Sequence, residues 1–226
     1  MVGLATRPTW NIVMNFYRRK LPHWQPAGAQ YFITYRLAGS LPRKVIQELQ
    51  LLREQFNSEE KTNNLSEQQK IQRKVFQRYE DALDRGNTGP TWLNSSAVAG
   101  VVKEAMHYRD SKEYDLFAYC IMSNHVHLVF EHLMGQPVNL LKEKKFPITA
   151  IMQELKRYTA YECNKILNRS GPFWQSESFD RVIRDQDELE NTIRYTLNNP
   201  VKAGLVQQWE DWPYNYCKPE FRENFM

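Results

Sequence analysis

The chain of 226 residues has no long apolar run and few cysteines, and each absence excludes a class of protein. No segment approaches the length of about 18 apolar residues needed to cross a bilayer, and no secretory leader is evident, so we expect no membrane contact and a cytoplasmic location. The three cysteines are widely spaced and form no Cys-x-x-Cys pair, which argues against a disulfide framework or a cysteine zinc site. A reducing compartment is therefore expected.

Charge of one sign is not in large excess either. The formal net charge of +4 is compatible with a phosphate-bearing partner but does not identify one. Hydrophobic residues make up 42% and aromatic residues 13%, which favours a folded globular protein over a disordered one. The length fits one large domain or a domain with extensions.

The hydrophobic pattern predicts an order of strand, helices, hairpin, helix, strand and helix. The first strand covers 30–37, the hairpin 113–131 and the last strand 179–183. This order matches an α+β ferredoxin-like sandwich, an antiparallel sheet of about four strands with helices on one face. A polar segment near 57–69 is interpreted as an insertion between the first strand and the hairpin.

The chain divides into a basic arm over 1–28, a domain over 29–206 and an aromatic tail over 207–226. The arm is either a frayed terminus or a segment that contacts DNA phosphates through its consecutive basic residues Arg18, Arg19 and Lys20. The tail is expected to pack on the domain, because its tryptophans and tyrosines carry large apolar rings.

His125 and His127 flank one valine in the second strand of the predicted hairpin. Strand side chains alternate, so the two imidazoles face one side and are close enough to share a metal ion. Neutral imidazole binds divalent ions, and two protein ligands leave coordination positions open for a phosphate oxygen. The alternative is a histidine pair on a solvent face or in a polar core.

Tyr195 and Asn199 are four residues apart in a predicted helix and therefore share a face. A phenol can act as a nucleophile, and an amide oxygen can act as a third metal ligand. Pro200 follows directly, so Asn199 is expected at the end of the helix. Tyr195 could also be a core tyrosine, and Tyr158 and Tyr161 on the preceding helix lie beside basic residues. The residues alone leave the nucleophile open.

Four segments resemble the REP-associated tyrosine transposases, a branch of the single-tyrosine HUH transposases of bacterial insertion sequences. They cover 30–42, 122–129, 173–185 and 193–206. The second contains Met-Ser-Asn-His-Val-His-Leu-Val, and the last contains Arg-Tyr-Thr-Leu-Asn-Asn-Pro. The last two segments, in this order after a His-Val-His strand, are the most specific part of the resemblance.

This resemblance implies the HUH variant of the ferredoxin-like fold and cleavage and rejoining of single-stranded DNA through a phosphotyrosine intermediate. It implies Tyr195 as the nucleophile and His125, His127 and Asn199 as ligands of Mg²⁺ or Mn²⁺. The implied partner is a DNA hairpin formed by a palindromic repeat, in a bacterial nucleoid. A monomer and a homodimer are both compatible with it.

Further residues are expected to hold the DNA. The basic side chains near the predicted site are Arg181, Arg184, Arg194 and Lys202, and arginine suits bidentate phosphate contacts. Trp174, with Phe173 beside it, could stack on unpaired bases. Each of these residues is alternatively a solvated charge or a core aromatic.

Two other functions are compatible with the residues. One is a non-catalytic single-stranded nucleic-acid-binding module that uses the aromatic strand with Tyr31, Phe32 and Tyr35. The other is a zinc-dependent hydrolase built on the histidine pair, which would release product without a covalent protein–DNA adduct.

Overall fold

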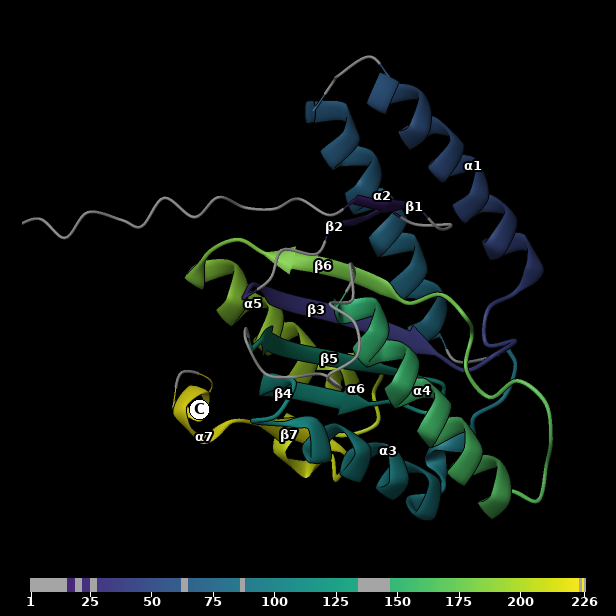
Figure 1. Cartoon of the computed structure of the whole chain (residues 1–226), viewed down its shortest axis with the longest axis vertical. Coiled ribbons are helices and arrows are strands. Elements are labelled where there is room, and N and C mark those ends of the chain that lie inside the picture. The colour runs from purple at the N-terminus through teal and green to yellow at the C-terminus, as the bar shows by residue number, and fades with distance from the viewer. Residues whose placement is uncertain are drawn as a thin grey trace, which may run out of the picture.

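The computed structural model describes residues 16–18, 22–24, 28–61, 65–85, 88–133, 147–223 and 225. Its centre is a five-stranded antiparallel sheet in the order β6-β3-β5-β4-β7 (Figure 1). The strands are β3 (Gln30–Arg36), β4 (Tyr114–Ile121), β5 (His125–His132), β6 (Phe179–Ile183) and β7 (Asn215–Cys217). The first four in chain order give the βαββαβ connectivity and strand order of a ferredoxin-like sandwich.

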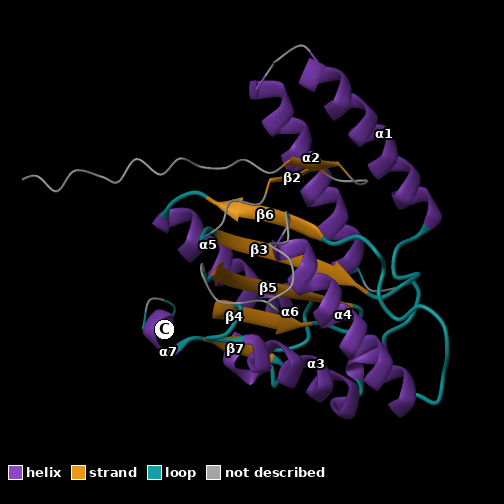
Figure 2. Cartoon of the chain, in the orientation of Figure 1, coloured by secondary structure: helices purple, strands orange, loops and turns teal. Residues whose placement is uncertain are grey.

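Helices lie on both faces of this sheet (Figure 2). The helices are α1 (Arg43–Lys61), α2 (Leu65–Asp84), α3 (Ser96–Arg109), α4 (Pro147–Ile166), α5 (Gln186–Leu197), α6 (Asn199–Lys202) and α7 (Pro219–Arg222). Two short 3₁₀ turns, η1 (Trp92–Asn94) and η2 (Trp209–Asp211), complete the described elements.

The central strand β3 is buried on both sides, which explains why its sequence is aromatic and β-branched without polar alternation. Tyr31, Ile33 and Tyr35 pack with α3 and α4 on one face. Phe32 packs on the other face with the apolar stripe of α5. The two faces therefore carry separate cores, and the histidines of β5 can be assigned to one of them.

The predicted α+β class and antiparallel sheet are confirmed, with two differences. The sheet has a fifth strand, because the tail contributes β7 along β4. Helices cover both faces rather than one, because α5 has an apolar stripe of Leu189, Ile193 and Leu197 that is buried against the sheet. The tail is tied down further by Trp212, whose indole N–H donates to the Ile121 carbonyl at 3.0 Å.

The segment interpreted as an insertion is not irregular where the structure describes it. Residues 57–61 end α1 and residues 65–69 begin α2, so this polar stretch forms the distal part of a helical hairpin that projects beyond the sheet (Figure 1). The hairpin is inserted between β3 and α3, and its near end returns to the sheet. That near end matters for the site described below.

The N-terminal arm is also more regular than expected. Its strands β1 (Phe16–Arg18) and β2 (Pro22–Trp24) pair antiparallel, and β2 lies next to β6. Arg18 ends β1, whereas Arg19 and Lys20 fall outside the described residues.

Candidate functional site

His125 and His127 point to the face of the sheet that α5 covers, as strand alternation predicts. Both side chains are buried, and their Nε2 atoms are 3.0 Å apart. The intervening Val126 faces the opposite core, with α3 and α4. The ring of His127 stacks on Phe32 from the neighbouring strand, which fixes its orientation.

The hydrogen bonds around the two rings define which nitrogen of each ring carries the proton. His125 Nδ1 lies 2.6 Å from Asn124 Oδ1, and the Asn124 amide is oriented by its bond to the Leu83 carbonyl. His127 Nδ1 lies 3.0 Å from Thr34 Oγ1, whose hydroxyl hydrogen is donated to Glu80 Oε1. Both Nδ1 atoms are therefore donors. The two unprotonated Nε2 lone pairs face each other.

Protonation of one ring would remove the repulsion between the two Nε2 lone pairs, but neither ring is protonated near neutral pH. Burial lowers the pKa of His125 to about 3. Burial, with the neighbouring His125 as a second cause, holds the pKa of His127 well below its usual value. Both rings are thus neutral ligands near neutral pH, and a cation placed at their Nε2 atoms is the interaction that this arrangement favours.

Helix α2 brings two carboxylates to the same point. Glu80 Oε2 lies 3.3 Å from His127 Nε2, and Asp84 Oδ1 lies 4.0 Å from His125 Nε2. One ligand atom from each of these four residues falls within 4.8 Å of the others. Nitrogen and carboxylate donors in such a set suit a divalent ion.

Tyr195 and Asn199 also reach this cluster, from α5 and from the start of α6. The Tyr195 hydroxyl donates to Glu80 Oε2 at 2.6 Å, and its ring contacts Phe32 and His127 edge-on. Asn199 is buried beside His127, and its amide raises the pKa of His127 slightly against the larger effect of burial. Helix α5 ends at Leu197, so Asn199 begins α6, but its Nδ2 still bonds the Tyr195 carbonyl at 3.4 Å. The four-residue spacing therefore still places Asn199 beside Tyr195, although α5 ends between them.

Two oxygens in the cluster lack a hydrogen-bond partner among the described residues: Asp84 Oδ1 and Asn199 Oδ1. Buried oxygen acceptors without a donor are costly, and a metal ion is one of the few groups that satisfies them. Together with the two bare Nε2 atoms they form a donor set that fits a divalent ion. Both carboxylate oxygens of Glu80, in contrast, accept a hydrogen bond, one from Thr34 and one from Tyr195.

The protons of Glu80 and Tyr195 are coupled. Burial raises the pKa of Glu80 to about 8, while the hydrogen bond from Tyr195 opposes this shift. Burial also raises the pKa of Tyr195, and the negative charge of Glu80 adds to the effect. The phenol is therefore held in its neutral form, with a carboxylate oxygen as the acceptor of its hydrogen.

We predict that Glu80→Gln removes a pH dependence of stability. The folded protein binds the Glu80 proton more tightly than the unfolded chain does, because the pKa of Glu80 is raised to about 8. This proton contributes fully to the free energy of unfolding below the usual pKa of a glutamate, and the contribution is lost as the pH rises through about 8. His125 and His127 do not interfere above about pH 7.5, because their pKa is low in the folded protein and about 6.5 in the unfolded chain. In chelator, the wild-type free energy of unfolding should fall by about 0.7 kcal/mol between pH 7.5 and 8.5, and that of Glu80→Gln should stay constant.

Urea unfolding at the two pH values measures this difference. Glu104→Gln, which removes an exposed carboxylate on α3, is the matched control and should follow the wild type. An equal fall in the Glu80→Gln variant would show that another group causes the pH dependence.

The other predicted residues are distributed unevenly. Lys202 lies at the site and pairs with Asp84 Oδ2 at 2.6 Å. Arg181 lies beside it, with its guanidinium over Phe32 and an ion pair to Glu188 at 3.2 Å. Arg184 and Arg194 are exposed at the two ends of α5. Trp174 is not part of the cluster, because it is buried on the α4 side and its indole N–H donates to Thr159.

The rival tyrosines are far from the histidine pair in the fold. Tyr158 and Tyr161 are 51% and 65% exposed on α4, which covers the opposite face of the sheet. The aromatic strand proposed for a nucleic-acid-binding module is also excluded as a stacking surface, because Tyr31, Phe32 and Tyr35 are fully buried.

Sequence reasoning missed Glu80 and Asp84. Their four-residue spacing on a predicted helix was a visible signal that two carboxylates share a face. No local pattern indicated that this helix face meets the histidine strand.

Among the described residues no helix is long and apolar enough to cross a membrane. No family model matches the chain. A Haemophilus influenzae protein assigned to the REP-associated tyrosine transposases is 32% identical over 107 residues, which cover 45% of this chain and 58% of the relative. The REP-associated tyrosine transposase of Escherichia coli K12 is 23% identical over 104 residues, covering 46% of this chain and 54% of the relative.

The chain is similar to REP-associated tyrosine transposases. The resemblance predicted from the motifs is thereby confirmed, while the chain spans only a little over half the length of these curated transposases. A solved structure of a REP-associated tyrosine transposase bound to a REP hairpin aligns over 88% of this chain and 80% of that one, with 16% identity and a TM-score of 0.45.

Proposed function

We propose that this protein is a metal-dependent single-stranded DNA transposase that cleaves and rejoins DNA at hairpin-forming palindromic repeats through a 5′-phosphotyrosine intermediate. The observation that carries the proposal is the cluster itself. Two neutral imidazoles, a buried amide oxygen and a phenol from distant parts of the chain meet in one place. The similarity to REP-associated tyrosine transposases supports the choice of DNA as the substrate.

The metal would be held by the Nε2 atoms of His125 and His127 and by the Oδ1 atoms of Asn199 and Asp84, and the two Oδ1 atoms have no hydrogen-bond partner among the described residues. Bound Mg²⁺ or Mn²⁺ supplies Lewis-acid polarisation of a phosphate oxygen. Thr34 and Asn124 act on the other side of the two imidazoles, where they fix the tautomers that leave both Nε2 atoms bare.

Tyr195 is the proposed nucleophile. When Glu80 is ionised, its Oε2, which lies 2.6 Å from the Tyr195 hydroxyl, takes up the hydroxyl hydrogen, and the phenolate oxygen forms a bond to phosphorus. The bond from phosphorus to the 3′ oxygen breaks, and that oxygen leaves and takes up a proton. Attack by another 3′ hydroxyl reverses these steps and joins a new strand, since the phosphodiester bond energy is retained.

Lys202, Arg181, Arg184 and Arg194 are proposed to contact DNA phosphates, and the basic residues of the N-terminal arm are proposed to extend this surface. Lys202 has a second effect, because its ion pair with Asp84 Oδ2 leaves Oδ1 directed at the histidines. The arm, the domain over 29–206 and the tail remain the proposed division of the chain.

The test is a covalent-adduct assay with single-stranded hairpin DNA. With Mn²⁺ or Mg²⁺ we expect a protein–DNA species that survives denaturant. With chelator its yield should fall below about 1% of that value, because the bare Nε2 atoms then have no cation through which to act. Restored yield on adding back Mn²⁺ is the control for damage by the chelator. Cleavage on water without an adduct would contradict the proposal and favour the hydrolase.

A further inference from the structure

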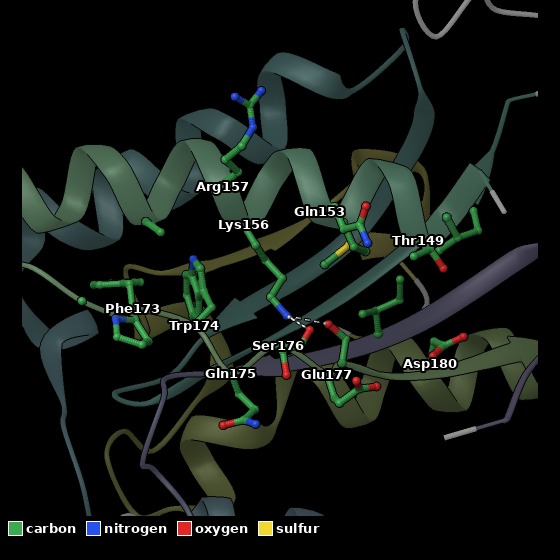
Figure 3. A pocket seen from close by; sticks show the side chains of 17 residues that line it. Thr149, Gln153, Lys156, Arg157, Phe173, Trp174, Gln175, Ser176, Glu177 and Asp180 are labelled. Atoms are coloured by element: carbon green, nitrogen blue, oxygen red, sulfur yellow. Dashed lines mark hydrogen bonds between the residues drawn. The ribbon is translucent and has the colours of Figure 1, made fainter. Parts of the chain in front are cut away.

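A cavity of about 460 Å³ is lined by residues of α4 and of the segment that follows it (Figure 3). It lies on the face of the sheet opposite the histidine cluster. It is enclosed by α4, by the segment over 171–178 and by the edge strand β6. Ile33 forms part of its floor and belongs to the α4 core, whereas its neighbours Phe32 and Thr34 face the cluster. The volume falls in the range of pockets that bind small organic groups.

The apolar wall of this cavity contains the indole ring of Trp174. The indole is fixed by its hydrogen bond to Thr159 Oγ1 at 2.8 Å and by edge-on packing with Tyr35. Met152 and Ala160 of α4 line the same space. The apolar space between Trp174 and these residues suits a flat heterocycle. The indole is already held in place, so stacking on it costs the protein little conformational entropy.

Lys156 provides a half-buried donor to the cavity. Its ammonium group donates to the Ser176 carbonyl at 2.9 Å and to Ser178 Oγ at 3.2 Å, so two of its three hydrogens are used on neutral oxygens (Figure 3). Burial lowers its pKa to about 8, and within the described ranges it forms no ion pair. A further acceptor near this nitrogen would therefore be stabilised.

The charges of the lining argue against an anion as the occupant. Glu177 and Asp180 bring two carboxylates to the cavity, while Arg157 is directed away from it (Figure 3). What remains is one cationic donor, carboxylate acceptors and the Gln153 amide, which both donates and accepts. This set matches a neutral ring that carries a carbonyl and an amino group, as cytosine and guanine do.

We propose that this cavity binds one unpaired cytosine or guanine base of the DNA strand, at a site separate from the cleavage cluster. The proposal rests on the proposed function, because that function supplies single-stranded DNA as the partner. The ring occupies the slot beside Trp174, Lys156 donates to its carbonyl oxygen, and the carboxylates accept from its amino group.

The experiment measures DNA binding with the full chain carrying Tyr195→Phe, so that no cleavage occurs. Hairpins with one common stem carry short unpaired tails of cytosine, of thymine or of abasic sites. Gln153→Trp places a large side chain at the exposed rim of the cavity, and Tyr161→Trp, on an exposed part of the same helix, is the matched control. Fluorescence anisotropy gives each dissociation constant.

For the Tyr161→Trp control we expect the cytosine tail to bind about tenfold more tightly than the abasic tail, the size expected for one stacked base. Gln153→Trp should remove this difference and leave the affinity for the abasic tail unchanged. Lys156→Met should reduce the difference, whereas Lys165→Met, at an exposed lysine of α4, should not.

Equal affinities for cytosine and abasic tails in the control would overturn the proposal, as would a preference that survives Gln153→Trp. Free deoxycytidine monophosphate serves as a separate arm. Binding of this nucleotide that depends on Gln153, without any effect of the tail base, would assign the cavity to free nucleotides and overturn the assignment to DNA. Adduct formation by Tyr195 is assayed separately, so a failed cavity and a failed nuclease give different results.

Discussion

Tyr195→Phe is expected to abolish the covalent protein–DNA adduct, with a loss of more than about a thousandfold, because the variant lacks the oxygen that would bond to phosphorus. The substitution is conservative for the fold. Phenylalanine retains the ring that packs edge-on against Phe32 and His127. The hydrogen bond to Glu80 is lost, at a cost of about 1 kcal/mol of stability.

Tyr158→Phe is the matched control, because it removes the same atom from an exposed tyrosine on the other side of the sheet. It should form adduct at the wild-type rate. The adduct is quantified on denaturing gels with labelled hairpin DNA in Mn²⁺. Loss of adduct in Tyr158→Phe with retention in Tyr195→Phe would reverse the assignment of the nucleophile.

His125→Ala and His127→Ala are each expected to weaken Mn²⁺ binding by about a hundredfold or more and to reduce adduct formation in parallel. Each variant removes one of two imidazoles whose Nε2 atoms lie 3.0 Å apart and whose Nδ1 atoms are held by protein hydrogen bonds. Isothermal titration with Mn²⁺ measures the affinity on the folded protein.

His132→Ala provides the comparison on the same strand. His132 is also buried, but it lies at the end of β5 and accepts from the Gly28 amide rather than joining the cluster. Its Mn²⁺ affinity should equal that of the wild type. A loss shared by all three alanine variants would indicate a general effect on folding and would argue against a specific metal site.

The parts of the site that sequence could predict are those defined by a local period. Alternation along a strand places His125 and His127 on one face, and the helical repeat places Asn199 beside Tyr195. The choice of Tyr195 over Tyr158 depended on the resemblance and not on these periods. The structure supports that choice by geometry, since Tyr195 contacts His127 whereas Tyr158 is exposed on the opposite face of the sheet.

The parts that sequence did not predict depend on how distant elements pack. Glu80 and Asp84 reach the histidines because the α1–α2 hairpin folds back onto β3, and no local pattern encodes that path. The packing of α5 on the second face of the sheet also depends on contacts between distant elements. Trp174 was expected near the catalytic residues as a stacking platform for DNA bases, but it lies on the face of the sheet opposite the histidines, packed edge-on against Tyr35. Side-chain chemistry alone does not distinguish these outcomes.

The burial of His125, His127 and Asn199 has a thermodynamic consequence for whatever binds them. A phosphate oxygen cannot reach atoms that solvent does not reach, so the resting arrangement, with Tyr195 tied to Glu80, must first open. Each ligand that requires the open arrangement has its apparent affinity reduced by the fraction of molecules that are open. If the cation and the DNA both require it, whichever arrives first bears that cost, and the second binds more tightly by the same factor.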